Sequence, residues 1–424
     1  MWSDGTPPER LRELVAELRA VLPDASVLSL QRQAGFAYLG TQFFDPPLAS
    51  FTYWGGYSIA SGPGGTRRLQ ACGFEMLDAM LEAWRGDSGA ILVGFLSYDL
   101  AAEIEELGPA PRADFTFPKF YFGLYPSAVN VGRPSVGGEP VRSSGPPDSR
   151  PDRAGFEASV VRTVARIHAG EIFQTNLCRC IDTAIEPGTE WELFRRMRAI
   201  SPARYEAFLR IDDQRAVLSI SPELFLKVDG GIVESAPIKG TRPRGLTTGV
   251  DDALLAELRS SEKDRAELAM IVDVVRNDLG RVCQVGSVNV VEHAVSMSLP
   301  TVHHLYSTVR GRLREDTGIV DLLRAAFPAA SISGAPKIEA MRVAMREEGQ
   351  LRGPCMGAIG WISLDGRMEM SVAIRTAFVS DGKVRYLAGC GITSGSNPAA
   401  EFEESRHKAA AFIRALGREE ESAR

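Results

Sequence analysis

The chain has 424 residues and a formal net charge of −6. This acidic balance argues against a nucleic-acid-binding protein, which normally carries a basic domain or stripe. No apolar run approaches the ~18 residues that a membrane-spanning helix needs, and the N-terminal residues lack the regions of a signal peptide. We therefore expect a cytoplasmic protein that binds neither nucleic acid nor membrane.

The six cysteines are scattered along the chain and form no C-x-x-C pair or other spacing typical of a zinc site. Free thiols in a reducing compartment are the simplest interpretation. The sequence therefore predicts neither a disulfide framework nor a structural metal.

The first third alternates short predicted helices and strands. Residues 10–22 have helical periodicity, and residues 89–100 resemble a buried strand that runs into a turn. Residues 130–155 are rich in Pro, Gly and Ser and predict a linker or long surface loop. We therefore divide the chain into an N-terminal region (1–129), this loop, and a larger C-terminal region (156–424).

The C-terminal region mixes helices with alternating strands in irregular order. An amphipathic helix is predicted for residues 155–169, ended by Gly170. Alternation of apolar and polar residues indicates antiparallel strands within 171–185, 215–238 and 287–298. Further helices are predicted at 261–279, 318–326, 336–348 and 398–416. This order favours an α+β fold over regular βαβ winding.

Two pairs of acidic residues each occupy one face of a predicted helix. Asp264 and Glu267 are three residues apart, as are Glu401 and Glu404. Acids near a helix start commonly do no more than interact with the helix dipole. If the two pairs faced each other, however, they would form an oxygen-rich site suited to Mg²⁺.

A second set of residues could bind an anion. Arg375 lies in an otherwise apolar strand, where it is either a rim arginine in a surface ion pair or a clamp on a carboxylate. Gly389 and Gly391 lie after Arg375 and shortly before the second predicted acidic helix. Glycine lets backbone N–H groups approach an anion closely, although one G-x-G is weak by itself.

Lys239 and Glu223 are candidate reacting groups. Lys239 follows an apolar strand end and is either an ordinary solvated charge or a buried amine. Burial and nearby cations can lower a lysine pKa far enough for the neutral amine to act as a nucleophile. Glu223 follows Pro222 in an apolar segment, and it is either an exposed loop residue or a desolvated general acid.

Six ordered motifs together resemble the chorismate-binding enzymes, a family that includes anthranilate, aminodeoxychorismate, isochorismate and salicylate synthases. The motifs are PIKGTRPRG, EKDRAELAMIVDVVRNDLGRV, VHHLYSTVRGRL, SISGAPKIEAM, RGPCMGAIGWISLDGRMEMSVAIRT and GCGITSGSNPAAEFEESRHKA. The motifs that carry the resemblance are closely spaced between residues 155 and 416, and the resemblance is weaker in the residues that precede them. It implies two large antiparallel sheets packed together, helices outside, and an active site in the central cleft.

The resemblance also implies the role of each candidate residue. Glu267 and Glu404 would hold Mg²⁺, with Asp264 and Glu401 in support. The implied chorismate contacts are Gly240, Thr241 and Lys408 near the ring carboxylate, His304 along the ring, and Arg375, Gly389 and Gly391 at the enolpyruvyl carboxylate.

Two positions indicate which reaction is performed. Family members that use water place a lysine base where this chain has Gln174, so amination by ammonia is favoured. Anthranilate synthases carry a motif similar to PIAGT at the position where this chain reads PIKGT. The form with lysine resembles the motif of aminodeoxychorismate synthase. That similarity implies that Lys239 attacks C2 while Glu223 protonates the leaving 4-hydroxyl, after which ammonia adds at C4. Cys355 replaces the family's usual tyrosine.

The source of ammonia is expected to be a separate subunit. No cysteine lies in a G-x-C-x-G elbow, so ammonia would come from free ammonium or from a separate glutamine amidotransferase, and we expect the latter. The expected pathway leads to 4-aminobenzoate and folate. Anthranilate synthase or 2-amino-2-deoxyisochorismate synthase activity remains the alternative. A non-catalytic chorismate-binding subunit is a further alternative, because of Cys355.

Overall fold

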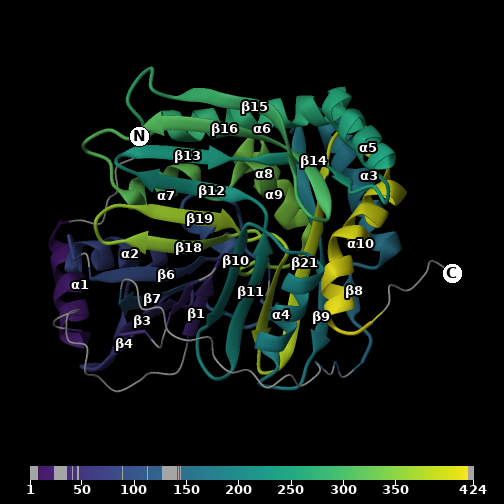
Figure 1. The fold of residues 1–424 in the computed structure, drawn as a ribbon. Helices are drawn as coiled ribbons and strands as arrows, with labels where there is room; N and C mark the ends of the chain where they lie inside the picture. The colour runs from purple at the N-terminus through teal and green to yellow at the C-terminus, as the bar shows by residue number, and fades with distance from the viewer. Residues whose placement is uncertain are drawn as a thin grey trace.

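Two antiparallel sheets and a set of outer helices form the architecture of the computed structural model (Figure 1). The structure describes residues 8–22, 36–40, 42–44, 47–87, 89–111, 113–126, 141, 143 and 145–418. The predicted α+β class with two large antiparallel sheets is confirmed. In these described ranges no helix has both the length and the apolar character needed to cross a membrane.

Sheet A contains nine described strands. They are β1 (Phe36–Leu39), β2 (Gln42–Phe44), β8 (Asp148–Arg150), β9 (Gln174–Ala184), β10 (Tyr205–Arg210), β11 (Arg215–Ser221), β17 (Gly334–Ala335), β20 (Thr376–Ser380) and β21 (Lys383–Ile392). Their order is β17-β9-β21-β20-β11-β10-β1-β2, with β8 paired to β9. The long β9–β21 pair runs from Thr175↔Ile392 to Ala184↔Lys383.

Sheet B contains twelve described strands. They are β3 (Ala49–Tyr53), β4 (Ser58–Gly62), β5 (Gly65–Leu69), β6 (Ala90–Leu96), β7 (Phe120–Pro126), β12 (Leu224–Asp229), β13 (Ile232–Ala236), β14 (Ile238–Pro243), β15 (Asn289–Ser298), β16 (Val302–Arg312), β18 (Ala358–Ser363) and β19 (Met368–Val372). Their order is β14-β16-β13-β12-β19-β18-β6-β7-β3-β4-β5, with β15 on the outer edge of β16.

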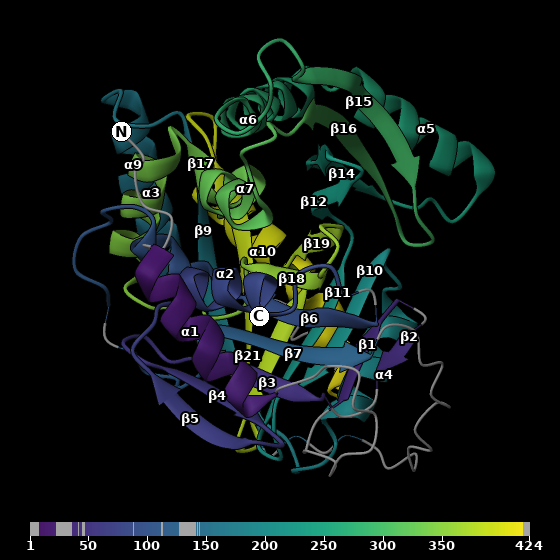
Figure 2. The same cartoon turned by 90° about the vertical axis from the view of Figure 1, so that its left-hand side faces the viewer.

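The helices lie outside the sheets. They are α1 (Pro8–Val21), α2 (Gly73–Ala83), α3 (Arg153–His168), α4 (Glu190–Ile200), α5 (Thr248–Ser260), α6 (Glu262–Gly280), α7 (Ile319–Ala326), α8 (Ala330–Ser333), α9 (Lys337–Glu348) and α10 (Pro398–Ala415), with a 3₁₀ helix η1 (Tyr98–Glu103). In Figure 1, α4 and α10 cover sheet A, and Figure 2 shows α1 beside α2 against the N-terminal strands.

The predicted helices agree with α1, α3, α6, α7, α9 and α10 to within about two residues, the usual scatter at helix ends. Their ends carry recognisable signals: Ser261 and Asn397 are N-caps that accept from the backbone N–H groups of Asp264 and Ala400. The segment KFYFGLYPSAVNV (119–131) predicts a pair of strands, of which β7 is the first and the second lies outside the described residues.

The main hydrophobic core lies between the two sheets. Phe95 and Ile359 on sheet B and Phe378 and Leu387 on sheet A belong to one cluster of buried side chains. Burial of apolar surface contributes roughly 25 cal/mol per Å², so this shared layer stabilises the packing of the two sheets. A second cluster packs sheet A against α4 and α10.

The N-terminal strands belong to both sheets. β1 pairs with β10 in sheet A, and β6 pairs with β18 in sheet B. Half of the loop predicted at 130–155 lies outside the described residues, and its end forms β8 and the start of α3. The N-terminal region therefore completes the same two sheets that the C-terminal region builds.

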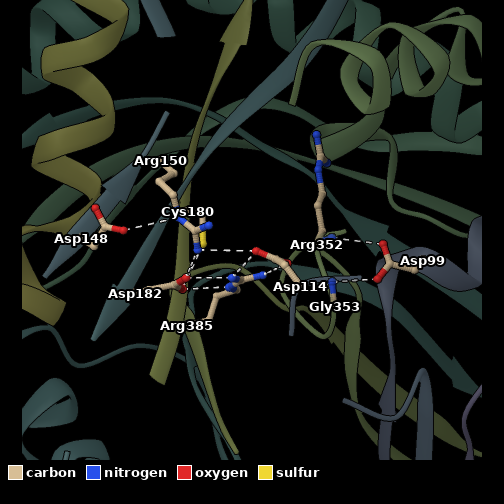
Figure 3. Close-up of polar contacts among 9 residues, drawn as sticks. All are labelled: Asp99, Asp114, Asp148, Arg150, Cys180, Asp182, Arg352, Gly353 and Arg385. Carbon is tan, nitrogen blue, oxygen red and sulfur yellow. Dashed lines mark hydrogen bonds and ion pairs between the residues drawn. The ribbon is translucent and has the colours of Figure 1, made fainter. Parts of the chain in front are cut away.

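Charged contacts also tie the N-terminal region to sheet A (Figure 3). The buried Arg385 on β21 donates two hydrogen bonds to Asp114, at 2.6 and 2.8 Å, and two to Asp182 on β9. Asp99 in η1 accepts the backbone N–H groups of Arg352 and Gly353, at 3.1 and 2.9 Å. Because these partners are far apart in sequence, the contacts fix how the regions meet.

Candidate active site

A bulge in β14 presents Lys239 and Thr241 beside the start of α6. The pairing of β14 with β16 shifts register between Lys239, opposite Leu305, and Thr241, opposite His304. Gly240 lies between them with φ of +75°, which favours glycine. A Cβ at Gly240 would lie 3.0 Å from the side chain of Asp264, so glycine also permits this close approach.

The Lys239 amine is half-buried and hydrogen-bonded to main chain. Its Nζ donates to the carbonyl oxygen of Ser331 at 3.2 Å. Among the described residues Lys239 forms no ion pair. Burial lowers the pKa of Lys239, and the positive charge of Lys408 acts in the same direction, while the carboxylates of the site partly oppose the shift.

Glu223 is a buried carboxyl close to this amine. It lies in the turn between β11 and β12, where its N–H donates to the Ser221 hydroxyl at 3.2 Å. Only 4% of Glu223 is exposed, and burial raises its pKa to about 7; the Ser331 hydroxyl and Lys239 offset part of the effect. A carboxyl with this pKa is protonated in a large fraction of molecules at neutral pH.

Gln174 and Gly391 bring sheet A to within contact distance of Lys239. These two residues belong to the β9–β21 pair, whereas Lys239 belongs to sheet B. A Cβ at Gly391 would lie 2.6 Å from Gln174 Nε2 and 3.3 Å from Lys239 Nζ. Gln174 is buried, and its Oε1 has no hydrogen-bond partner in the described part of the chain. The candidate site therefore lies where the two sheets meet.

The acidic helices α6 and α10 place Glu267 and Glu404 in one electrostatic environment. Burial raises the pKa of Glu267, and the charges of Asp264 and Glu404 add to that shift. Burial also acts on Glu404, but its 2.7 Å ion pair with Lys408 outweighs that effect and lowers the pKa. Carboxylates that raise one another's pKa are stabilised by a bound cation.

The two supporting acids have partners of their own. Asp264 accepts a hydrogen bond from Arg242 at 3.0 Å, and Glu401 accepts one from the Ser396 hydroxyl at 2.7 Å. The ligand atoms of Glu401, Glu404 and Cys390 lie within 4.8 Å of one another. Glu401 and Glu404 supply oxygen ligands of the kind that Mg²⁺ prefers, and Glu267, which lies outside this group, is related to it through the effect of the Glu404 charge on its pKa.

Arg375 supplies a half-buried positive charge. Its backbone adopts a φ of +50°, and its guanidinium makes a long 3.5 Å contact with the Ser201 hydroxyl. Throughout the described ranges it has no carboxylate within ion-pair distance. Buried guanidinium groups are normally paired, so an anionic ligand is a natural partner for this one.

The positive charge of Arg375 affects the pKa of His304. Nδ1 of His304 contacts the Thr241 hydroxyl at 2.9 Å. Burial lowers the pKa of His304 to about 4, and the charge of Arg375 adds to that shift, so the ring is neutral at pH 7. Its buried Nε2 lacks a hydrogen-bond partner within the residues described. The ring is therefore able to bond a ligand through this nitrogen.

Gly389 on β21 and Lys408 on α10 form another side of the site. Lys408 Nζ donates to the carbonyl of Gly389 at 2.9 Å as well as to Glu404. A Cβ at Gly389 would lie 2.5 Å from Asn176 Oδ1, so the residue must be glycine for β21 to lie this close to the β9 side chains. These contacts fix the Glu404 carboxylate relative to β21.

Cys355, the position that departs from the family pattern, is buried. Its thiol donates to the carbonyl oxygen of Thr376 at 3.0 Å, and burial raises its pKa to about 12. The group is therefore a protonated core thiol. Sequence reasoning missed Ser331 and Arg242, whose contacts with Lys239 and Asp264 depend on long-range packing.

The chain belongs to the family of chorismate binding enzymes, whose model matches residues 133–414. It is 36% identical over 339 residues to aminodeoxychorismate synthase component 1 of Salmonella typhimurium, covering 74% of each chain. It is 38% identical over 344 residues to anthranilate synthase component 1 of Saccharolobus solfataricus, covering 77% of this chain and 80% of that one.

Two further comparisons bear on extent and fold. An aminodeoxychorismate synthase of Streptomyces griseus is 47% identical over 281 residues, but this match spans only 38% of that protein. The crystal structure of anthranilate synthase component I from Streptococcus pneumoniae superposes with a TM-score of 0.76 and 25% identity, over 98% of this chain and all of that one.

Proposed function

We propose that the chain is the aminating subunit of a 4-amino-4-deoxychorismate synthase. The observation that carries the proposal is the Lys239 amine. It lies at the junction of the sheets, forms no ion pair among the described residues, and has a pKa lowered by burial. Glu223 lies in its electrostatic environment, with a pKa of about 7. These observations support a mechanism in which Lys239 acts as the nucleophile and Glu223 as the acid.

The proposed first step forms a covalent intermediate. The lone pair of Lys239 Nζ forms a bond to C2 of chorismate, the ring double bonds shift, and the C4–O bond breaks. The leaving oxygen takes its proton from Glu223 and departs as water. Burial favours both required protonation states, because it disfavours the charged form of each group.

The proposed second step releases the lysine. Ammonia forms a bond to C4, the double bonds shift back, and the electron pair of the C2–N bond returns to Lys239. The new ammonium group gives one proton to the Glu223 carboxylate, which restores the acid. The sum is chorismate plus ammonia to 4-amino-4-deoxychorismate plus water.

The remaining residues are proposed to bind the substrate. Arg375 and the backbone at Gly389 and Gly391 hold the enolpyruvyl carboxylate, and Gly240, Thr241 and Lys408 lie near the ring carboxylate. His304 lies along the ring and Gln174 beside the reacting carbons. Glu267 and Glu404, with Asp264 and Glu401 in support, would hold Mg²⁺, which would supply positive charge for the ring carboxylate.

A second candidate is anthranilate synthase, because the similar proteins include anthranilate synthase components as well as aminodeoxychorismate synthases. Lys239 favours the first candidate, since amination at C2 requires no lysine nucleophile there. The chain incubated with chorismate, ammonium and Mg²⁺ is expected to give a product with the mass of 4-amino-4-deoxychorismate. Formation of the fluorescent product anthranilate would overturn the proposal.

Ammonia is proposed to come from a separate glutamine amidotransferase. The support is that similar proteins carry the name component 1, which implies a second component. Glutamine alone is expected to support little turnover, and addition of the amidotransferase is expected to raise it to the level reached with ammonium. Equal turnover with and without that partner would contradict this part of the proposal.

A further inference from the structure

The guanidinium of Arg352 joins three elements that surround the candidate site. The side chain, drawn in Figure 3, is almost completely buried, with 2% exposed. It donates hydrogen bonds to the carbonyl oxygens of Ile332 in α8, at 3.1 Å, and Asn176 in β9, at 2.7 Å. It also forms a bidentate pair with Glu348 at the end of α9, at 2.7 and 3.0 Å. One side chain therefore fixes how α8, β9 and α9 lie relative to one another.

The carbonyl that Arg352 holds in α8 is next to the one that holds the Lys239 amine. Because α8 is a single turn, the carbonyls near its end need partners outside the helix. The Ser331 carbonyl accepts from Lys239 Nζ at 3.2 Å, and the following carbonyl, that of Ile332, accepts from Arg352. Peptide groups are planar, and these two share the Cα of Ile332. Fixing the Ile332 carbonyl therefore limits how far the Ser331 carbonyl can turn.

The carbonyl that Arg352 holds in β9 belongs to the strand pair on another side of the amine. Asn176 lies opposite Gly391 in the β9–β21 pair. The backbone of Gly391 is so close to Lys239 that a Cβ there would lie 3.3 Å from Nζ. The helix α8 and the β9–β21 pair therefore both approach the amine, and both are bound to the same guanidinium.

We propose that Arg352 is a positioning residue, which holds α8 and β9 at the separation that directs the Lys239 amine toward the substrate. The inference rests on the proposed function, because it needs Lys239 as the nucleophile, and it assigns Arg352 no contact with the substrate. A guanidinium has five N–H donors in one rigid plane, so it bonds Glu348 along one edge and still reaches both carbonyls. Displacement of a reacting group by about 1 Å can cost about 10²-fold in rate, so this separation affects turnover.

The variant Arg352→Lys tests the position of the amine without removing the buried charge. Lysine keeps the partner that Glu348 requires, but its ammonium donates from one nitrogen and cannot replace Nη1, Nη2 and Nε together. We expect kcat per folded molecule to fall by about tenfold or more, while KM for chorismate changes by less than about threefold. The folded fraction is measured by circular dichroism. A merely structural role would lower Tm and leave kcat per folded molecule unchanged.

A double variant removes the ion pair without leaving a buried charge behind. Arg352→Met combined with Glu348→Gln takes away both charges, and glutamine keeps an oxygen for the Cys178 N–H that Glu348 accepts at 2.8 Å. Replacing both members of a buried pair is often neutral for stability, whereas removal of one is not. We expect this variant to keep a Tm close to that of the parent and still to show the fall in kcat.

Arg385→Met is the matched control. Arg385 is as buried as Arg352, but its partner Asp182 lies near the opposite end of β9 from Asn176. Loss of this arginine therefore leaves the contacts around Lys239 in place. We expect a lower Tm and a kcat per folded molecule within about twofold of the parent value.

The results separate two kinds of failure. If the parent forms 4-amino-4-deoxychorismate and either Arg352→Lys or the double variant keeps the parent's kcat per folded molecule, the Arg352 proposal is overturned and the proposed function stands. The Arg352 proposal is also overturned if Arg385→Met lowers kcat per folded molecule equally. If the parent forms a different product, the proposed function fails, and the role of Arg352 fails with it.

Discussion

Burial acts on the two proposed reacting side chains in opposite directions, and both shifts favour the neutral form. The Glu223 carboxyl binds its proton more tightly, and the Lys239 ammonium binds its proton less tightly. Each group also appears in the electrostatic environment of the other. A neutral acid beside a neutral amine is the arrangement that the proposed first step requires.

Replacing Glu223 with glutamine is expected to remove the limb on which activity falls at high pH. In the parent, activity requires protonated Glu223 and is lost as pH rises through about 7, the raised pKa of that carboxyl. Glutamine cannot release a proton, so kcat is expected to fall by about 10²–10⁴-fold. The measurement is kcat between pH 5.5 and 9. A variant that keeps the parent's falling limb would assign that limb to another group.

Most of the candidate site residues could be named from the sequence because each lies within a short motif. Lys239, Gln174 and Gly391 come together although they are far apart in the chain. The contacts made by Ser331 could not be predicted, since a backbone carbonyl leaves no signature in residue type. The ion pair of Asp264 with Arg242 was missed for a related reason: side-chain partners depend on how β14 meets α6.

At the scale of elements, the close approach of β21 to β14 depends on glycine. Gly391→Ala is expected to displace the Gln174 amide, because the new Cβ would lie 2.6 Å from Nε2 and 3.3 Å from Lys239 Nζ. We expect kcat/KM to fall by about tenfold or more without loss of fold. Gly395→Ala is the control, since a Cβ there has no atom within 4 Å. Equal activity of both variants would contradict the placement of Gly391.

The acidic helices α6 and α10 carry a second prediction. Glu267→Gln removes a proposed ligand and its charge, so the Mg²⁺ concentration needed for half-maximal activity is expected to rise by about tenfold or more. Glu403→Gln is the control, because Glu403 lies on α10 in ion pairs with Arg153 and Arg406. Titration of activity with Mg²⁺ after treatment with a chelator is the measurement. An unchanged requirement in Glu267→Gln would remove this residue from the metal site.

Helix positions could be predicted closely and strand partners could not. Caps and breakers such as Asn397 and Gly170 are local in sequence, so α10 and α3 were expected near their observed ends. Strand pairing is non-local: β9 pairs with β21, about two hundred residues later. The family resemblance implied the two sheets. The alternation of apolar and polar residues did not predict the order of the strands within them.

At the scale of the molecule, the ion pairs of Arg385 join the N-terminal region to sheet A. Arg385→Met leaves Asp114 and Asp182 without their buried partner, although both carboxylates are partly exposed. We expect a loss of about 1–3 kcal/mol in the free energy of unfolding, less than for a fully buried pair. Thermal unfolding of this variant and of Arg367→Met, whose exposed pair is with Asp365, is the measurement.

The pH dependence of that loss follows from the same carboxylates. Arg385 holds the pKa of Asp114 below its ordinary value, so the stabilisation is present at neutral pH and is lost as pH falls through the lowered pKa. The difference between parent and Arg385→Met is therefore expected to shrink in acid. A difference that stays constant from pH 7 to pH 3 would show that packing, and not charge, is lost.

The turnover of Lys239→Ala tests the central claim most directly. The proposed chemistry begins with attack by this amine, so formation of 4-amino-4-deoxychorismate from chorismate, ammonium and Mg²⁺ is expected to fall by about 10³-fold or more. Lys227→Ala, a substitution at another lysine of sheet B, is expected to retain the parent's activity. A folded Lys239→Ala variant that still forms the product within about tenfold of the parent rate would contradict the account.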